Sequence, residues 1–154
     1  IEVMGHKCGE LALAAGVAGG AESILIPEIE PDTEQVVNKI NQGSKRGKLH
    51  SIIIVAEEVY PVTKLRDIIK DKTGQDVRVT ILGHVQRGGT PTAHDRILAS
   101  TFGKEAIDLI EHGLKNVMIA SHADRLHAIP LAEVIHGHRT PKLEMFEIAR
   151  VLSI

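Results

Sequence analysis

The chain has 154 residues, 43% of them apolar and 25% charged, and is therefore long enough to bury an aliphatic core as a single domain. Its 18 basic and 20 acidic residues give a formal net charge of −2, which argues against a polyanion-binding protein held by bulk electrostatics. One cysteine, 2% aromatic residues and no apolar run near the ~18 residues of a membrane helix argue against disulfides, single-stranded nucleic-acid binding and membrane insertion, so we expect a cytoplasmic protein.

Short apolar segments alternate with segments of helical period along the chain. The expected strands are near-continuously apolar, as in strands covered on both faces: Ile1–Val3, Ser23–Ile26, Ser51–Ala56, Val77–Leu82 and Val117–Ala120. The expected helices are Glu10–Ala18, Thr33–Gln42, Thr63–Lys72 and Asp95–Glu111, followed by Leu131–Ile135 and Leu143–Leu152, which Gly137 and Pro141 separate. This order predicts an α/β fold, a Rossmann-like three-layer sandwich with a mainly parallel sheet.

Capping residues support these helix boundaries. Asp32 or Thr33 is expected to cap the second helix, and Thr92 with Asp95 has the spacing of a capping box. Three glycines follow helical segments, at positions where a left-handed residue commonly ends a helix: Gly43, Gly74 and Gly113. We therefore expect the helices to end at these glycines.

Ligands of open α/β sheets bind beyond the carboxyl ends of the strands, so polar residues at these ends are the candidates for chemistry. In the turn Met4, Gly5 and His6, the glycine lets backbone N–H groups approach a ligand near a helix N-terminus. Glu57 and Glu58 follow the third strand, where one carboxylate could accept hydrogen bonds from sugar hydroxyls. The alternatives are a tight turn in the first case and a solvated loop in the second.

The segment after the fourth strand carries the strongest signal. His84 and Arg87 flank Val85 and Gln86, and on a turn both can face one point. An Arg fork suits a phosphate dianion, and a histidine adds a second donor. The segment therefore predicts a phosphate clamp, with a structural turn carrying a surface arginine as the alternative.

Two further places carry weaker signals. Arg78 lies inside the expected fourth strand, where a charge has to face an edge or a partner chain, so we expect it to serve a neighbouring subunit. A glycine turn and a basic loop could hold an anion's phosphates, with Glu22 holding a divalent metal beside them. These are Gly19–Glu22 and Lys45–His50, for which plain surface is the alternative.

Motifs of catalysis and metal binding are otherwise absent. The sequence has no P-loop, no GxGxxG turn, no GxSxG elbow and no HExxH or CxxC spacing. His136 and His138 flank Gly137 and could bind an ion, or simply form a loop. The residues by themselves thus indicate a domain that binds a phosphorylated small molecule and supplies no catalytic base.

Several of these segments closely resemble the bacterial ATP-dependent 6-phosphofructokinases. The resemblance is carried by Val3-Met4-Gly5, Ala18-Gly19-Gly20-Ala21-Glu22, Pro27-Glu28, the run from Leu82 through His84 and Arg87 to Pro91, and Asp95-Arg96. It runs with even spacing from Ile1 to about Gly113 and more loosely to the end. It implies that residues 1–154 are the sugar-phosphate-binding half of the enzyme, with the phosphofructokinase-type C-terminal fold, and that the N-terminal ATP-binding half is absent.

The resemblance also implies an activity: phosphorylation of fructose 6-phosphate at its 1-hydroxyl by ATP, with Mg²⁺, in a glycolytic homotetramer. The implied substrate residues are Met4, Gly5, His6, Glu57, His84, Val85, Gln86 and Arg87, with Arg78 lent to the adjacent subunit. The implied effector site, for ADP or phosphoenolpyruvate, comprises Gly20, Ala21, Glu22, Arg46, Lys48, Leu49 and His50, with an effector-site Mg²⁺ at Glu22.

One residue departs from the family pattern. His6 stands where the family usually has an arginine, so it supplies a cation only when protonated and cannot form a bidentate fork. As a possible transition-state contact it would stabilise the transferred phosphoryl group less well. The catalytic base belongs to the absent half, so we expect no catalysis from this chain alone. A pyrophosphate-dependent enzyme and a non-catalytic phosphosugar sensor remain alternatives.

Overall fold

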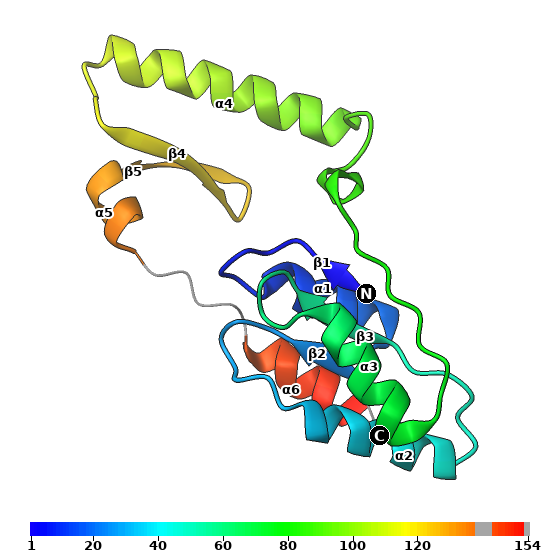
Figure 1. The fold of residues 1–154 in the computed structure, drawn as a ribbon. Helices are drawn as coiled ribbons and strands as arrows, with labels where there is room; N and C mark the ends of the chain where they lie inside the picture. The colour runs from blue at the N-terminus through cyan, green and yellow to red at the C-terminus, as the bar shows by residue number, and fades with distance from the viewer. Residues whose placement is uncertain (138–142, 153–154) are drawn as a thin grey trace. The chain divides into compact units, whose positions relative to one another are not determined.

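The computed structural model describes residues 1–137 and 143–152, which form parts of two compact units (Figure 1). Unit 1 is Ile1–Arg87 together with the C-terminal segment from Thr140, and unit 2 is Gly88–Arg139. The expected roles of His138 and Pro141 fall outside the described residues. None of the helices described here has the length and apolar character needed to cross a membrane.

Unit 1 contains a three-stranded parallel sheet. Its elements, in chain order, are β1 (Glu2–Val3), α1 (Glu10–Gly19), β2 (Ser23–Leu25), α2 (Thr33–Lys45), β3 (Ile53–Ala56), α3 (Val62–Thr73), the 3₁₀ helix η1 (His84–Arg87) and α6 (Leu143–Leu152). The strand order is β1-β3-β2, with Glu2 opposite Val55 and Ser23 opposite Ile53. The predicted strand direction is therefore confirmed for this sheet.

Helices cover both faces of the sheet. Successive residues of each strand point to opposite faces, so an apolar strand presents side chains to be buried on both. Ile24 and Ile54 belong to the buried cluster that α1 and α6 complete. Leu25 and Val55, the next residues along, belong to the cluster that α2 and α3 complete. The three-layer sandwich predicted from the near-continuous apolar runs is thus confirmed.

The expected strand Val77–Leu82 is reduced to one bridge, in which Ile81 pairs in parallel with Glu2. The Glu2 N–H donates to the Thr80 carbonyl at 2.8 Å, and the Leu82 N–H donates to the Glu2 carbonyl at 3.0 Å. Because β1 is only two residues long, it offers pairing partners to no more of this segment. Arg78 therefore lies on extended chain outside the sheet, which corrects its placement in a strand.

Unit 2 contains α4 (Ala93–Glu111), β4 (Val117–His122), β5 (Arg125–Pro130) and α5 (Leu131–His136). The predicted strand Val117–Ala120 exists, but its expected place in a covered parallel sheet is wrong, because β4 pairs with β5 as an antiparallel hairpin. Its turn residues Ala123 and Asp124 both have positive φ, as a two-residue hairpin turn requires. The pair lacks the usual glycine, which explains why the sequence did not predict β5.

The predicted helix starts are confirmed. The Asp32 side chain accepts a hydrogen bond from the Gln35 N–H at 2.9 Å and caps α2. At α4 the Thr92 hydroxyl accepts from the Asp95 N–H, and the Asp95 carboxylate accepts from the Thr92 N–H at 2.7 Å. Both helices therefore begin at a side chain that satisfies an otherwise unpaired backbone donor.

The predicted helix ends are right at two of the three glycines. Gly74 ends α3, and Gly113 follows the end of α4, both with positive φ. Gly43 instead lies inside α2, which continues to Lys45. Gly47 takes the left-handed conformation there, and the Lys48 N–H bonds back to the Gly43 carbonyl at 3.0 Å.

Close packing at Gly9, just before α1, gives a test of this core. A Cβ at Gly9 would lie 2.5 Å from the Cβ of buried Ile26, which cannot move without the backbone that follows β2. Gly9→Ala should lower the free energy of unfolding by about 1–3 kcal/mol in denaturant titrations. Gly19→Ala is the control, because a Cβ there meets nothing within 4 Å. Equal stabilities of the two variants would contradict the close packing.

Candidate functional site

The carboxyl ends of β1 and β3 lie next to each other, because Val3 pairs with Ala56. Glu57, the first residue after β3, donates its N–H to the Val3 carbonyl at 2.9 Å. Its Oε1 accepts hydrogen bonds from the N–H groups of Gly5 at 3.1 Å and His6 at 2.7 Å. The two candidate segments that the sequence singled out at these strand ends are therefore brought together.

The surroundings of Glu57 favour the ionised form of its carboxylate. The hydrogen bonds from Gly5 and His6 hold the pKa of Glu57 below its ordinary value, and the nearby charges of His6 and Arg87 act in the same direction. Both backbone donors bind the same oxygen, which leaves Oε2 to accept hydrogen bonds from a ligand. The geometry thus suits an acceptor for hydroxyl groups.

The helix η1 brings the third segment to the same edge. The Gln86 Oε1 accepts a hydrogen bond from the Met4 N–H at 3.1 Å, so this side chain joins η1 to the end of β1. His84 and Arg87 are exposed, and side chains three apart in a 3₁₀ helix lie one above the other. The position of this helix therefore fits the predicted clamp, while Gln86 acts as its anchor; Val85 is exposed between them.

The His6 side chain has a partner that the sequence did not predict. Its Nδ1 lies 3.2 Å from Oε2 of Glu58, and both side chains are about two-thirds exposed. Glu58 was singled out only as an alternative acceptor beside Glu57. No spacing rule could have found the pair, because 52 residues separate its members and only the pairing of β1 with β3 brings them together.

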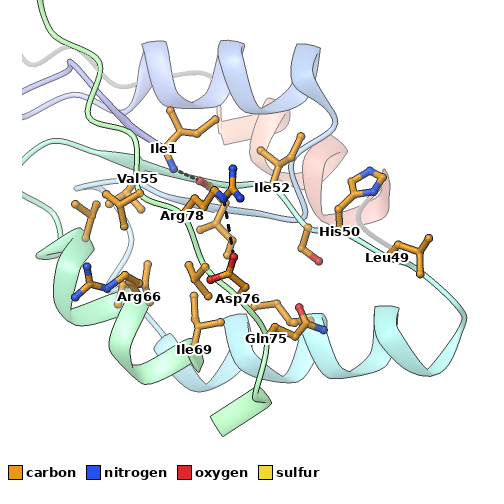
Figure 2. A pocket seen from close by; sticks show the side chains of 17 residues that line it. Ile1, Leu49, His50, Ile52, Val55, Arg66, Ile69, Gln75, Asp76 and Arg78 are labelled. Atoms are coloured by element: carbon orange, nitrogen blue, oxygen red, sulfur yellow. Dashed lines mark hydrogen bonds and ion pairs between the residues drawn. The ribbon is translucent and has the colours of Figure 1, made fainter. Parts of the chain in front are cut away.

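Arg78 lies apart from this edge. It is 93% exposed, and its Nε lies 3.9 Å from the Asp76 carboxylate. Figure 2 shows it at the wall of a largely apolar cavity of about 260 Å³, together with Leu49 and His50. Leu49 and His50 thus line the same cavity as Arg78, whereas the predicted effector residues Glu22, Arg46 and Lys48 line a different one.

A basic cavity of about 320 Å³ lies at the opposite edge of the sheet, before β2 and β3 begin. It is lined by Glu22, Arg46 and Lys48, which the sequence predicted, and by Lys39, which it missed. The Lys39 Nζ donates to the Glu22 carbonyl at 3.0 Å. The helical period predicted that Val36 and Ile40 face the core, but it gave no sign that Lys39 lines a cavity. Gly20 and Ala21 form the turn that leads into Glu22.

The Glu22 carboxylate is fully engaged within the protein. Its Oε1 lies 2.5 Å from the Lys48 Nζ, and its Oε2 accepts a hydrogen bond from the Ile52 N–H. Burial by itself would raise the pKa of Glu22, but these contacts outweigh it and hold the pKa below its ordinary value. Within residues 1–137 and 143–152, no three His, Cys, Asp or Glu side chains form a metal-binding group. Mg²⁺ needs only one or two carboxylates beside waters and ligand phosphates, so the effector-site Mg²⁺ at Glu22 stays a prediction.

Comparison with known proteins agrees with the motifs. A family model described as Phosphofructokinase matches residues 1–110. The chain is 50% identical over 154 residues to the ATP-dependent 6-phosphofructokinase of Natranaerobius thermophilus and 46% identical to that of Alkaliphilus metalliredigens. Each comparison covers all of this chain and 48% of the relative, so the chain spans about half the length of these curated relatives.

Solved structures show the same similarity. Phosphofructokinase from Saccharomyces cerevisiae is 34% identical with a TM-score of 0.75, covering 98% of this chain and 21% of that one. The T-state phosphofructokinase of Pichia pastoris is also 34% identical, with a TM-score of 0.76 and coverage of 98% and 18%. The matched residues include the β1 turn, Glu57 and η1, and the resemblance inferred from the motifs is confirmed: the chain belongs to the phosphofructokinase family.

Proposed function

We propose that this chain is the substrate- and effector-binding half of an ATP-dependent 6-phosphofructokinase. The complete enzyme transfers a phosphoryl group from ATP to the 1-hydroxyl of fructose 6-phosphate in glycolysis. The observation that carries the proposal is the meeting of Met4–His6, Glu57 and η1 at one edge of the sheet. The 50% identity over the whole chain to a relative named ATP-dependent 6-phosphofructokinase supports the same reaction.

Each part of this edge has a role that follows from its chemistry. The ionised Glu57 accepts hydrogen bonds from sugar hydroxyls, and the exposed Arg87 and His84 bind the phosphate of the sugar. Gln86 and the Met4 turn fix the distance between the two groups of contacts. This half therefore positions the acceptor for in-line transfer, which is the main task of the protein in phosphoryl-transfer enzymes.

The phosphoryl donor, its Mg²⁺ and the catalytic base belong, in this proposal, to the half of the enzyme outside this chain. In this structure the two carboxylate oxygens of Glu22 contact Lys48 and Ile52, and no step is assigned to Mg²⁺ there. The basic cavity with Arg46 and Lys48 is proposed to bind a phosphorylated effector such as ADP or phosphoenolpyruvate.

The complete enzyme is proposed to be a cytoplasmic homotetramer, with Arg78 reaching the site of a neighbouring subunit. The 93% exposure of Arg78 supports such a role. The 19-residue helix α4 exposes three large apolar side chains. These are Ile97, Ile107 and Ile110, which are 57–68% exposed. Large apolar side chains exposed along one helix favour packing against a further domain or subunit.

The assay that tests the function uses the enzyme in which this chain is joined to its nucleotide-binding half. With fructose 6-phosphate, we expect fructose 1,6-bisphosphate to form with ATP as donor and not with pyrophosphate. Turnover with pyrophosphate alone would reassign the donor. Binding of fructose 6-phosphate without turnover from either donor would favour a phosphosugar sensor.

Arg87→Ala in the same enzyme tests the phosphate clamp. Loss of a charged hydrogen bond should weaken binding of fructose 6-phosphate by about 1.5–3 kcal/mol, read from the KM for the sugar phosphate, with the KM for ATP unchanged. Arg66→Ala is the control, because Arg66 is a half-buried arginine paired with Asp67 on α3 and has no assigned role in the substrate site. An unchanged KM in Arg87→Ala would remove this residue from the site.

The carboxylate of Glu22 gives a pH-dependent prediction. Its pKa in the folded chain lies below the ordinary value of 4.5, so its stabilising contribution is present above about pH 4.5 and is lost as the pH falls through the folded value. Glu22→Gln should therefore lower the free energy of unfolding by about 1–3 kcal/mol at pH 7, and the difference from the unsubstituted chain should shrink below pH 4.5.

Denaturant titrations at several pH values measure this difference, and Glu34→Gln is its control. Glu34 forms an exposed ion pair with Lys72, which contributes no more than about 1 kcal/mol. A Glu22→Gln effect that does not vary between pH 7 and pH 3.5 would contradict the engagement of the ionised carboxylate by Lys48 and Ile52.

A further inference from the structure

Two neighbouring turns at the candidate substrate edge hold non-glycine residues in the left-handed region. His6 has a φ of 47° in the turn after β1, and Glu58 has a φ of 66° in the turn after β3. Each such residue costs about 1–3 kcal/mol and persists only where its surroundings hold it in place. Strained residues of this kind concentrate at functional sites, which makes the contacts that maintain these two turns candidates for a functional role.

The backbone of the first turn is held by Glu57. Its Oε1 accepts from the N–H groups of both Gly5 and His6, which fixes the path of the chain through residues 4–6. These bonds do not restrain the His6 ring. The ring is restrained by Glu58, whose Oε2 lies 3.2 Å from Nδ1. The two adjacent carboxylates therefore divide the task, one holding the backbone and the other the side chain.

Stability alone does not account for the second contact. The side chains of His6 and Glu58 are 65% and 67% exposed, and an exposed ion pair contributes about 0–1 kcal/mol. That is no more than the cost of one left-handed residue. What the contact does determine is direction: with Nδ1 bound to Glu58, the ring presents Nε2 as its remaining hydrogen-bonding group.

We propose that Glu58 is a positioning residue that orients the His6 imidazole so that Nε2 contacts the phosphorylated sugar. This inference rests on the proposed function and deepens it, because it assigns a role to a residue outside the predicted site. Two carboxylates contact His6 directly: Glu58 at the ring and Glu57 at the backbone N–H. The charges of both His6 and Arg87 act on Glu57. Glu58 acts through His6 and does not touch the substrate.

A double-mutant cycle in the complete enzyme tests the proposal. Glu58→Gln removes the charge with little change of shape and should lower kcat/KM for fructose 6-phosphate about three- to tenfold, with the KM for ATP unchanged. In a His6→Ala background the same substitution should have no further effect. A loss of equal size in both backgrounds, or no loss in either, would overturn the positioning role.

Two controls separate positioning from structure. Glu58→Gly relieves the left-handed strain but lacks the carboxylate, so it should be as impaired as Glu58→Gln; full activity in this variant would show that the backbone alone matters and would overturn the proposal. Glu34→Gln removes an exposed ion pair between α2 and α3 and should leave kcat/KM unchanged.

The outcome for Arg87 distinguishes failure of this inference from failure of the proposed function. If Arg87→Ala raises the KM for fructose 6-phosphate while Glu58→Gln changes nothing, the substrate site stands and the role of Glu58 is rejected. If neither substitution affects the sugar phosphate, the site itself is wrongly placed and both proposals fail.

Discussion

The parallel pairing of β1 with β3 determines the geometry of the candidate substrate edge. Because Val3 lies opposite Ala56, the turn after β1 meets the first residue after β3, and one carboxylate oxygen of Glu57 accepts two N–H groups from that turn. Gln86 then joins η1 to Met4. The turn after β1 is thereby hydrogen-bonded both to Glu57 and to η1, two segments that are far from it in the sequence.

A buried carboxylate, that of Glu22, is bound at the amino end of β3. Glu22, just before β2, accepts a hydrogen bond from the Ile52 N–H just before β3 and forms an ion pair with Lys48. One carboxylate therefore stands at each edge of the sheet, Glu57 at the carboxyl ends of the strands and Glu22 at the amino ends. The first faces the proposed substrate site, and the second lies in the basic cavity proposed for an effector. A ligand at one edge therefore need not displace a ligand at the other.

Local signals predicted most of the fold. The apolar runs and helical periods located the strands and helices of unit 1, and Asp32 and Thr92 marked helix starts correctly because capping depends only on residues within one turn. The strand predictions that failed depend on tertiary pairing partners. Val77–Leu82 has the composition of a strand but finds only the two residues of β1 as a partner, and Val117–Ala120 pairs with a hairpin neighbour instead of a parallel strand.

The sequence by itself determined the family and nominated the residues of the candidate site, because the motif around His84 and Arg87 and the turn at Met4 are contiguous and specific. Only the tertiary structure decided which side chains meet. The His6–Glu58 ion pair, the anchoring of Met4 by Gln86 and the presence of Lys39 beside Glu22 all depend on contacts between residues at least 17 positions apart. Such contacts are set by strand register and helix packing, which no local pattern of residues encodes.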